Sequence, residues 1–407
     1  MQAVLRKHAA GSTPAFTTRL PNKRQTLVVA GTLGKDASAF QRLTLGRRLV
    51  AAATNQKAGS LGICVIGHDN VETVIADVLA AALAAAFPMP SFKQKPDSPS
   101  IRSVRLLGLA ERIDTTRVEA EAAGNNLARW VTTMPPNKFD AVSYAAAAQG
   151  LAKARGWDYK RYDTKALTKL GAGAFLAVAQ GNENDSAGIV RLRYRPGKKS
   201  ATPDLALVGK GIIFDTGGTN LKPAGSMLDM HGDMQGSAVA FGTLLAISDL
   251  QLPIAVDCWL ALTENRTSAS AYKQQDVVTA ANGKTIQTMH TDAEGRMALA
   301  DTLVLASREK PAIMFDYATL TGTCVSALTT KYSGVFTNRA ELHPKLKRTG
   351  AASGERVWPF PIGDDFLDGL KSDVADFLQC SPKGAGDHIL VATCPSPSSL
   401  SLALRSM

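Results

Sequence analysis

The feature that most constrains this chain is an alternation of short apolar runs with alanine-rich helical stretches, which begins near residue 26. In the first third, apolar runs at 26–30, 62–66 and 104–109 are separated by helical patterns at 37–53 and 71–87. Strands and helices that alternate in this way are typical of α/β folds, in which helices cover the faces of a sheet. We therefore predict a small α/β domain at the N-terminus.

Two successive prolines mark the junction between this domain and the rest of the chain. A helical pattern that starts at Thr116 ends before them, because the residue before a proline is pushed out of the helical conformation. A length of 407 residues is also more than one core normally supports. We predict an N-terminal domain at 1–113, a linker helix at 114–137 and a second domain at 138–407, to which the chemistry described below belongs.

The alternation resumes beyond the junction. Helices are predicted at 142–154, 237–248 and 297–307. Apolar runs lie at 175–179, 189–194 and 205–208, and strands are predicted at 254–262 and 312–315. The second domain is therefore predicted to be a larger α/β unit around a mixed sheet.

Composition limits the class of protein and its compartment. A formal net charge of +11 would attract polyanions, but the basic residues are spread out and no nucleic-acid module accompanies them. The five cysteines are far apart, which favours a reducing compartment over a disulfide framework. The sequence contains neither an apolar signal core nor a run long enough to cross a membrane, so a cytoplasmic location is expected.

Two acidic clusters next to glycines carry the chemistry of the second domain. In the first, Asp215 ends an apolar run just before two glycines, and Asp233 follows ahead of a predicted helix. In the second, Asp292 and Glu294 are two residues apart, so they point the same way in an extended segment. Glycines let the backbone approach a ligand closely. We expect these segments to converge on one site.

Four carboxylates in one site would repel one another, and at least one would take up a proton unless cations were present. Two divalent ions carry a matching positive charge; in two-metal hydrolases such ions, about 3.5 to 4 Å apart, activate a water and polarise a carbonyl or phosphoryl oxygen. Taken singly, each acid is more often a helix cap or a surface salt-bridge partner. Together, the clusters predict a two-metal hydrolase.

Five sequence blocks resemble the leucyl aminopeptidase family of cytosolic metallo-exopeptidases. In order, they are Lys210–Gly218, Leu221–Pro223, Asp233–Gly236, Thr291–Arg296 and Ala318–Gly322. The match is most specific over 205–328, good over about 129–376 and weak in the first domain. The resemblance implies an α/β fold, an aminopeptidase activity and a homohexamer.

The resemblance also implies a ligand set. Asp215 and Glu294 would bridge the two ions. Asp233 and Lys210 would complete one site, and Asp292 would complete the other. Lysine is an unusual ligand, because its free pKa is about 10.4 and the metal must displace its proton. A simple ion pair with an acid is the alternative for Lys210. The ions would be Mn²⁺ or Zn²⁺, and the ligand set does not decide between them.

Other residues are expected to act on the substrate. By the resemblance, Lys222 would stay charged and stabilise the oxyanion that develops on the scissile carbonyl. Arg296 offers a planar fork for a bidentate oxyanion, and in the family it holds a bicarbonate ion that serves as general base. Thr319 and Leu320 would line the place of the substrate backbone and first side chain. Alternatively, these two residues only turn the chain.

The C-terminal end departs from the family. Segments 372–376 and 384–389 follow the family outline, but its later helix and closing strand are absent. The sequence from about 390 is atypical, as in a truncated chain, and is expected to add little to the core. A missing strand would leave the sheet with an unpaired edge and the pocket without a wall.

The sequence therefore predicts a metal-dependent aminopeptidase that releases N-terminal amino acids from peptides by attack of a metal-bridging water. A peptide's free α-amine would bind one metal, which endopeptide substrates cannot imitate. The alternative is a catalytically impaired family member that acts as an oligomeric DNA-binding protein through its basic surface. A two-metal phosphoesterase fits Lys210 and Lys222 less well.

Overall fold

The computed structural model describes residues 15–197, 202–384, 386–393 and 399–403. The chain divides into two compact units, of which the first comprises Met1–Asn126 with Arg348–Glu355 and the second comprises the rest. The boundary falls inside helix α4 (Thr116–Thr133), in the segment predicted as a linker helix. Each unit is described by itself.

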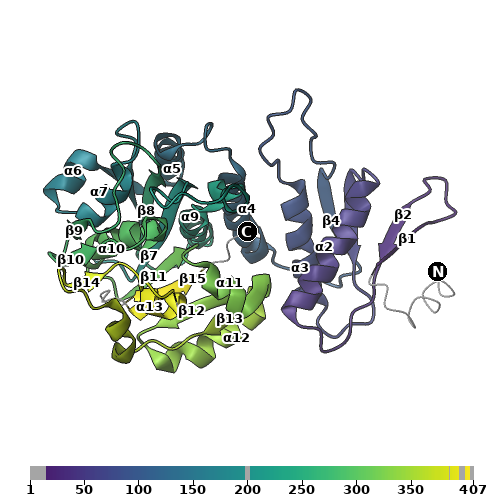
Figure 1. Cartoon of the computed structure of the whole chain (residues 1–407). Helices are drawn as coiled ribbons and strands as arrows, with labels where there is room; N and C mark the ends of the chain where they lie inside the picture. The colour runs from purple at the N-terminus through teal and green to yellow at the C-terminus, as the bar shows by residue number, and fades with distance from the viewer. Residues whose placement is uncertain (1–14, 198–201, 385, 394–398, 404–407) are drawn as a thin grey trace. The chain divides into compact units, whose positions relative to one another are not determined.

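Apart from pieces of α4 and α12, the described residues of the first unit form the small sheets β1-β2 and β3-β4 and the helices α2 and α3 (Figure 1). Its elements are β1 (Phe16–Arg19), β2 (Leu27–Ala30), α2 (Ala39–Asn55), β3 (Ser60–Cys64), α3 (Val71–Ala86) and β4 (Ser103–Leu107). Strands β1 and β2 are antiparallel, whereas β3 and β4 are parallel. The apolar faces of β3 and α3 meet through Ile63, Ile75 and Leu79. This unit confirms the small α/β fold predicted from the alternation.

The second unit is built on an eight-stranded mixed sheet in the order β13-β12-β15-β11-β7-β8-β6-β5. Its strands are β5 (Asp158–Asp163), β6 (Gly188–Tyr194), β7 (Leu205–Asp215), β8 (Val256–Asn265), β11 (Ile313–Ala318), β12 (Ser333–Thr337), β13 (Val357–Pro359) and β15 (Ser399–Ala403). The central strands β15, β11, β7 and β8 are parallel, and β6 and β5 continue antiparallel. A small sheet of β9 (Val277–Thr279), β10 (Thr285–Gln287) and β14 (Phe377–Leu378) lies beside it.

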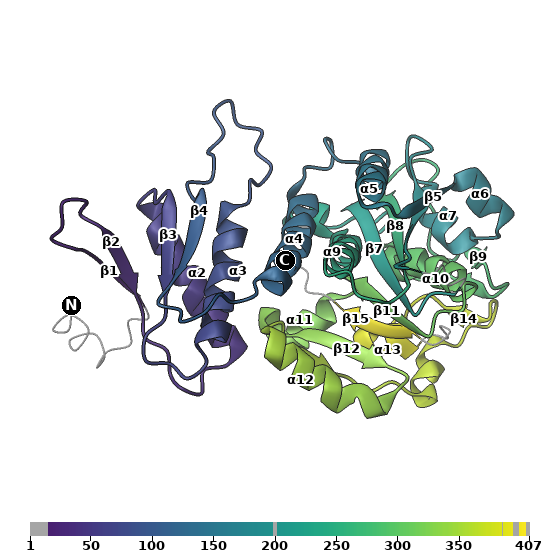
Figure 2. The same ribbon diagram turned by 180° about the vertical axis from the view of Figure 1, so that it is seen from behind.

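Helices cover both faces of the large sheet (Figure 2). The α-helices after α4 are α5 (Ala141–Arg155), α6 (Thr164–Lys169), α7 (Gly173–Ala179), α8 (Ala224–Met227), α9 (Gln235–Asp249), α10 (Glu294–Ser307), α11 (Gly322–Leu328), α12 (His343–Ser353) and α13 (Asp387–Thr393). The 3-10 helices are η1 (Met230–Gly232), η2 (Thr291–Ala293), η3 (Thr329–Lys331), η4 (Ala340–Leu342) and η5 (Asp364–Leu370).

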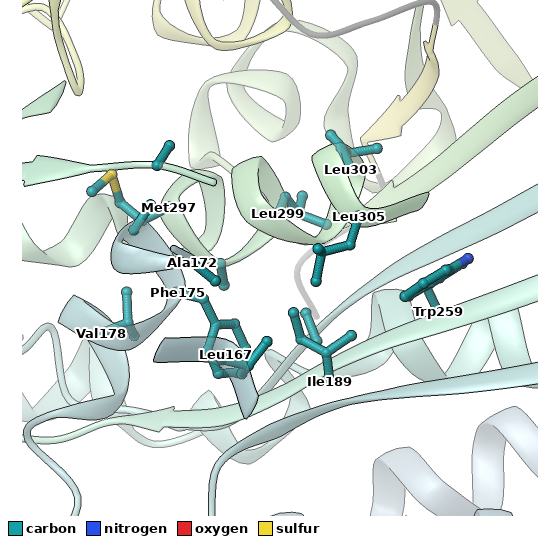
Figure 3. Packing of buried hydrophobic residues seen from close by; sticks show 14 of the residues in the cluster. Leu167, Ala172, Phe175, Val178, Ile189, Trp259, Met297, Leu299, Leu303 and Leu305 are labelled. Atoms are coloured by element: carbon teal, nitrogen blue, oxygen red, sulfur yellow. The ribbon is translucent and has the colours of Figure 1, made fainter. Parts of the chain in front are cut away.

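One face of the central strands packs against α7 and α10 (Figure 3). Phe175 and Leu299 project from these helices towards Ile189 and Trp259 of the sheet. Helix α9 packs very closely against the other face. A Cβ on Gly209 would lie only 2.4 Å from Cα of Ser237, so this approach requires glycine. Strand β7, which ends at Asp215 of the first acidic cluster, is therefore packed tightly on both faces.

The apolar run 175–179 lies in helix α7, where its side chains pack against α10 as well as the sheet. One expectation about the tail is corrected. The absence of the family's closing strand would have left a sheet edge unpaired, yet the backbone of β15 pairs with β11 on one side and β12 on the other. Residues 394–398 and 404–407 of that tail lie outside the described residues. Within the described part of the chain, no helix combines the length and apolar character that crossing a membrane requires.

Candidate metal centre

Strand β7 presents Lys210 and Asp215 on the same side of the sheet. Lys210 pairs in register with Ala261 of β8, and Asp215 pairs with Asn265, but the register shifts between Ile212 and Asp215. Residues an odd number apart normally point to opposite faces of a strand. The one extra residue on β7 reverses that alternation, as a β-bulge does, and brings Asp215 to the face of Lys210.

The glycines after β7 allow a tight loop that fixes Asp215. Gly217 has φ of 85°, and a Cβ there would lie 2.4 Å from the carbonyl oxygen of Asn220. The Gly217 N–H donates to Oδ1 of Asp215 at 2.8 Å, and Nδ2 of Asn265 donates to the same oxygen at 2.8 Å. The other oxygen of Asp215 is thereby left towards the site, where Lys222 reaches it.

Lys210 forms the buried half of the site. Its Nζ lies 2.8 Å from Oδ2 of Asp233 and 3.0 Å from Oε1 of Glu294, and it donates to the Thr319 carbonyl at 2.7 Å. Although burial works to lower the pKa of Lys210, the carboxylates of Asp233, Glu294 and Asp215 outweigh it and raise that pKa. The surrounding carboxylates thus stabilise the charged form of Lys210.

Lys222 forms the more open half. It follows the Gly217 loop, and its Nζ lies 2.9 Å from Oδ2 of Asp215 and also pairs with Oδ1 of Asp292. Burial works to lower its pKa too, but Asp215 and Asp292 raise it overall. The structure therefore contains two lysines, each of which bridges one pair of the four predicted carboxylates.

The four carboxylates carry more negative charge than the two lysines balance. Ligand oxygens of Asp215, Asp292 and Glu294 all lie within 4.8 Å of one another. Burial, followed by the charge of Asp215, raises the pKa of Glu294 to about 8. Burial is also the main cause that raises the pKa of Asp233 to about 6 and that of Asp292 above its ordinary value. Carboxylates that resist ionisation in this way fit a site completed by divalent cations.

The turn into α10 shows how closely the two clusters meet. A Cβ on Gly295 would lie 2.6 Å from Cε of Lys210, so any side chain there would displace the lysine. This glycine lets the start of α10 approach β7, and it brings Glu294 to within ion-pair distance of Lys210. His290 caps η2, because its Nδ1 accepts from the Asp292 N–H at 3.3 Å.

The remaining predicted residues surround this cluster. The Thr319 hydroxyl donates to Oδ1 of Asp233 at 2.6 Å, and Leu320 is a half-buried side chain packed against the core shown in Figure 3. Arg296 lies in the first turn of α10, and its guanidinium pairs with Asp387 at 2.9 Å. The structure thus places Thr319 against a predicted ligand and Arg296 against a carboxylate that was not among the predicted site residues.

Three further polar residues support the site and were missed by the sequence reasoning. Nδ2 of Asn265 also donates to Oε2 of Glu294 at 3.3 Å. The buried Thr291 hydroxyl donates to the Gly217 carbonyl at 2.6 Å, which ties the two clusters together. Nε2 of Gln379 donates to the Ala293 carbonyl at 3.0 Å. Two of the three had a signal in the sequence: Asn265 ends the parallel strand next to Asp215, and Thr291 begins one of the five sequence blocks.

Comparison with known proteins agrees with this geometry. The model of the "Cytosol aminopeptidase family, catalytic domain" matches residues 126–394. The chain belongs to the cytosol aminopeptidase family. It is 35% identical over 375 residues to a probable cytosol aminopeptidase of Synechococcus elongatus, covering 91% of this chain and 76% of that protein.

Other members of the cytosol aminopeptidase family give the same result. The cytosol aminopeptidase of Pseudomonas aeruginosa is 36% identical over 386 residues, which cover 90% of this chain and 76% of that protein. A solved structure of a mutant of tomato leucine aminopeptidase matches with a TM-score of 0.88 at 26% identity, covering 99% of this chain and 81% of that one. The family and the α/β fold predicted from the five sequence blocks are therefore confirmed.

Proposed function

We propose that this chain is a metal-dependent aminopeptidase that releases N-terminal amino acids from peptides. The observation that carries the proposal is the convergence of both acidic clusters on Lys210 and Lys222 in a chain of the cytosol aminopeptidase family. The raised pKa values of the buried acids support divalent cations as the missing charge.

The residues proposed to hold two ions, Mn²⁺ or Zn²⁺, are Lys210, Asp215, Asp233, Asp292 and Glu294. When bound, such ions supply an activated water and polarise the scissile carbonyl. Lys210 acts as a ligand only after it loses its proton, since an ammonium has no lone pair to donate. Its buried position between two carboxylates supports this exchange of one positive charge for another.

Lys222 is proposed to hold its proton and to donate to the substrate's carbonyl oxygen as negative charge develops there. Its place on a loop, with a side chain 15% exposed, supports a role towards substrate. Thr319 and Leu320 are proposed to line the pocket for the first residue. A peptide's N-terminal amine would meet the acidic cluster, which supports the preference for a free N-terminus.

The expected bicarbonate at Arg296 stays a prediction. Such an ion would have to share the guanidinium with Asp387, which already approaches Nη2 at 2.9 Å. A homohexamer and a cytoplasmic location also stay predictions, supported by the resemblance and by the name of the family. None of the comparisons favours the alternative of a DNA-binding protein, whose sign would be DNA affinity that falls steeply with salt.

The test is hydrolysis of leucine and other amino-acid p-nitroanilides by the purified chain, with Mn²⁺ or Zn²⁺ and after chelation. We expect turnover that the chelator abolishes and added metal restores. An N-acetylated leucine p-nitroanilide is the matched control, because it lacks the free amine. Absence of turnover in the presence of bound metal, or equal turnover of the acetylated substrate, would contradict the proposal.

A further inference from the structure

The guanidinium of Arg296 is engaged by a carboxylate from the C-terminal segment. Nη1 of Arg296 donates to Oδ1 of Asp387 at 3.0 Å, and Nη2 donates to Oδ2 at 2.9 Å. Both oxygens of one carboxylate thus fill the fork that a guanidinium offers to planar oxyanions. The two side chains are 11% and 18% exposed, so water screens this pair only weakly.

Asp387 is held in its ionised form at this position. Burial works to raise the pKa of Asp387, but the Arg296 guanidinium outweighs burial and holds it below its ordinary value. The Thr321 side chain also lowers the pKa of this carboxylate. Asp387 therefore ties the C-terminal segment to the first turn of α10, which begins at Glu294.

A second residue of the same segment fixes the chain on the other side of Glu294. Oε1 of Gln379 accepts from the backbone N–H groups of Met289 and His290, both at 3.1 Å, while its Nε2 donates to Ala293. The backbone carbonyl of Gln379 accepts from Nη1 of Arg296 at 3.3 Å. The C-terminal segment thus holds the chain on both sides of Asp292 and Glu294.

We propose that Asp387 is a built-in oxyanion, which fills the Arg296 fork in place of a bicarbonate ion and positions the metal-binding segment. The role of this site in turnover rests on the proposed function. A tethered group acts at an effective concentration of millimolar order or above. Asp387 therefore outcompetes a weakly bound free anion, and the intact chain takes none at Arg296.

The first experiment measures bicarbonate binding to the metal-free chain by isothermal titration calorimetry, with formate as a second probe. We expect no binding at Arg296 in the intact chain. Asp387→Ala empties the fork and should gain a saturable anion site. The double variant Asp387→Ala/Arg296→Ala should lose that site again, which locates it. Asp368→Ala is the matched control, because its carboxylate comes from the same part of the chain but pairs with the exposed Lys371.

Saturable binding of bicarbonate to the intact chain that Arg296→Ala abolishes would overturn the proposal, as would a folded Asp387→Ala chain that gains no anion site. If Asp387→Ala does not fold, Asp387→Ser empties the fork with a smaller loss of polarity. The measurement on the intact chain still tests whether Arg296 binds bicarbonate.

The second readout is turnover with metal. Asp387→Ala should lose about ten- to hundredfold, as is usual for groups that orient a metal site from behind the ligands. Bicarbonate should restore much of this loss in Asp387→Ala and leave the intact chain unchanged. A merely structural role predicts a loss without rescue, and that result would overturn the proposal. Because anion binding is measured without metal, an inactive chain would refute the proposed function while this inference is still tested.

Discussion

The two lysines of the metal centre make the most instructive comparison within this molecule. Each bridges two carboxylates, but the side chain of Lys210 is 4% exposed and that of Lys222 is 15% exposed. Lys210 belongs to the central strand β7, whereas Lys222 follows a glycine loop. Among their partners, Glu294 is 1% exposed and Asp292 is 27% exposed.

This difference separates a fixed half of the site from a half open to substrate. The Lys210 half is surrounded by strand, helix and backbone carbonyl, so its charges interact in a medium of low polarity. The Lys222 half borders water, which screens its charges. The same ion-pair chemistry therefore serves a permanent metal-holding role in one half and a substrate-directed role in the other.

The largest effect is expected from removing the lysine of the buried half. Lys210→Met leaves Asp233 and Glu294 without their shared cation, which should cost the metal-free chain about 3 to 5 kcal/mol of unfolding free energy. Lys222→Met should cost only about 1 to 3 kcal/mol, because water reaches Asp292. Urea unfolding above pH 8, where Glu294 is ionised, measures both. Equal losses would contradict the division into two halves.

The next largest effect is expected from Asp292→Asn, which should lower activity and leave stability nearly unchanged. The substitution keeps the shape of the side chain and removes a proposed ligand charge, so metal-dependent turnover should fall by more than about a hundredfold, beyond the usual effect of groups behind the ligands. The unfolding midpoint without metal should change little, since Asp292 is partly exposed. Asp276→Asn is the control, because this partly exposed carboxylate in the preceding loop pairs with Lys273 outside the site. Full turnover of Asp292→Asn would refute its assignment.

The pH dependence of the buried half should have opposite signs with and without metal. Glu294 has an ordinary pKa of 4.5 that the fold raises to about 8, so the folded chain favours its protonated form. Stability of the metal-free chain should therefore fall as pH rises through this window. Metal binding displaces those protons, so metal affinity should rise over the same range. Calorimetry in two buffers of different ionisation enthalpy would detect the released protons, and affinity independent of pH would contradict this.

The smallest effect is expected from an exposed pair outside the site. Nζ of Lys371 lies 2.7 Å from Oδ1 of Asp368, but the two side chains are 78% and 77% exposed. Solvent screening removes most of the attraction in such pairs. Lys371→Met should leave both the unfolding midpoint and turnover unchanged. A loss comparable with that of Lys222→Met would show that distance, rather than burial, sets the strength of these pairs.

Much of the site could be predicted because its residues lie in two short segments with strong local patterns. Asp215 ends an apolar run before glycines, and Asp292 and Glu294 precede a helix. The structure brings these residues together with Asp233 and both lysines. Their roles as metal ligands stay predictions, which the shared position of the carboxylates supports.

The supporting contacts could not be predicted, because their partners are distant in sequence. Gln379 and Asp387 reach residues 289–296 across about ninety positions. Nothing in their local sequence distinguishes them from surface polar residues. The pairing of β15 was missed for the same reason, since a short tail segment with many helix and strand breakers gains its partners only from β11 and β12.

The sequence by itself determined the α/β alternation, the family and the two acidic clusters, since each follows from residues close together in the chain. Only the tertiary structure decided which lysine is buried, that the bulge in β7 turns Asp215 towards Lys210, and that Arg296 meets Asp387. The physical reason is that burial, strand register and ion pairing depend on which distant segments pack together, and local sequence patterns do not specify those partners.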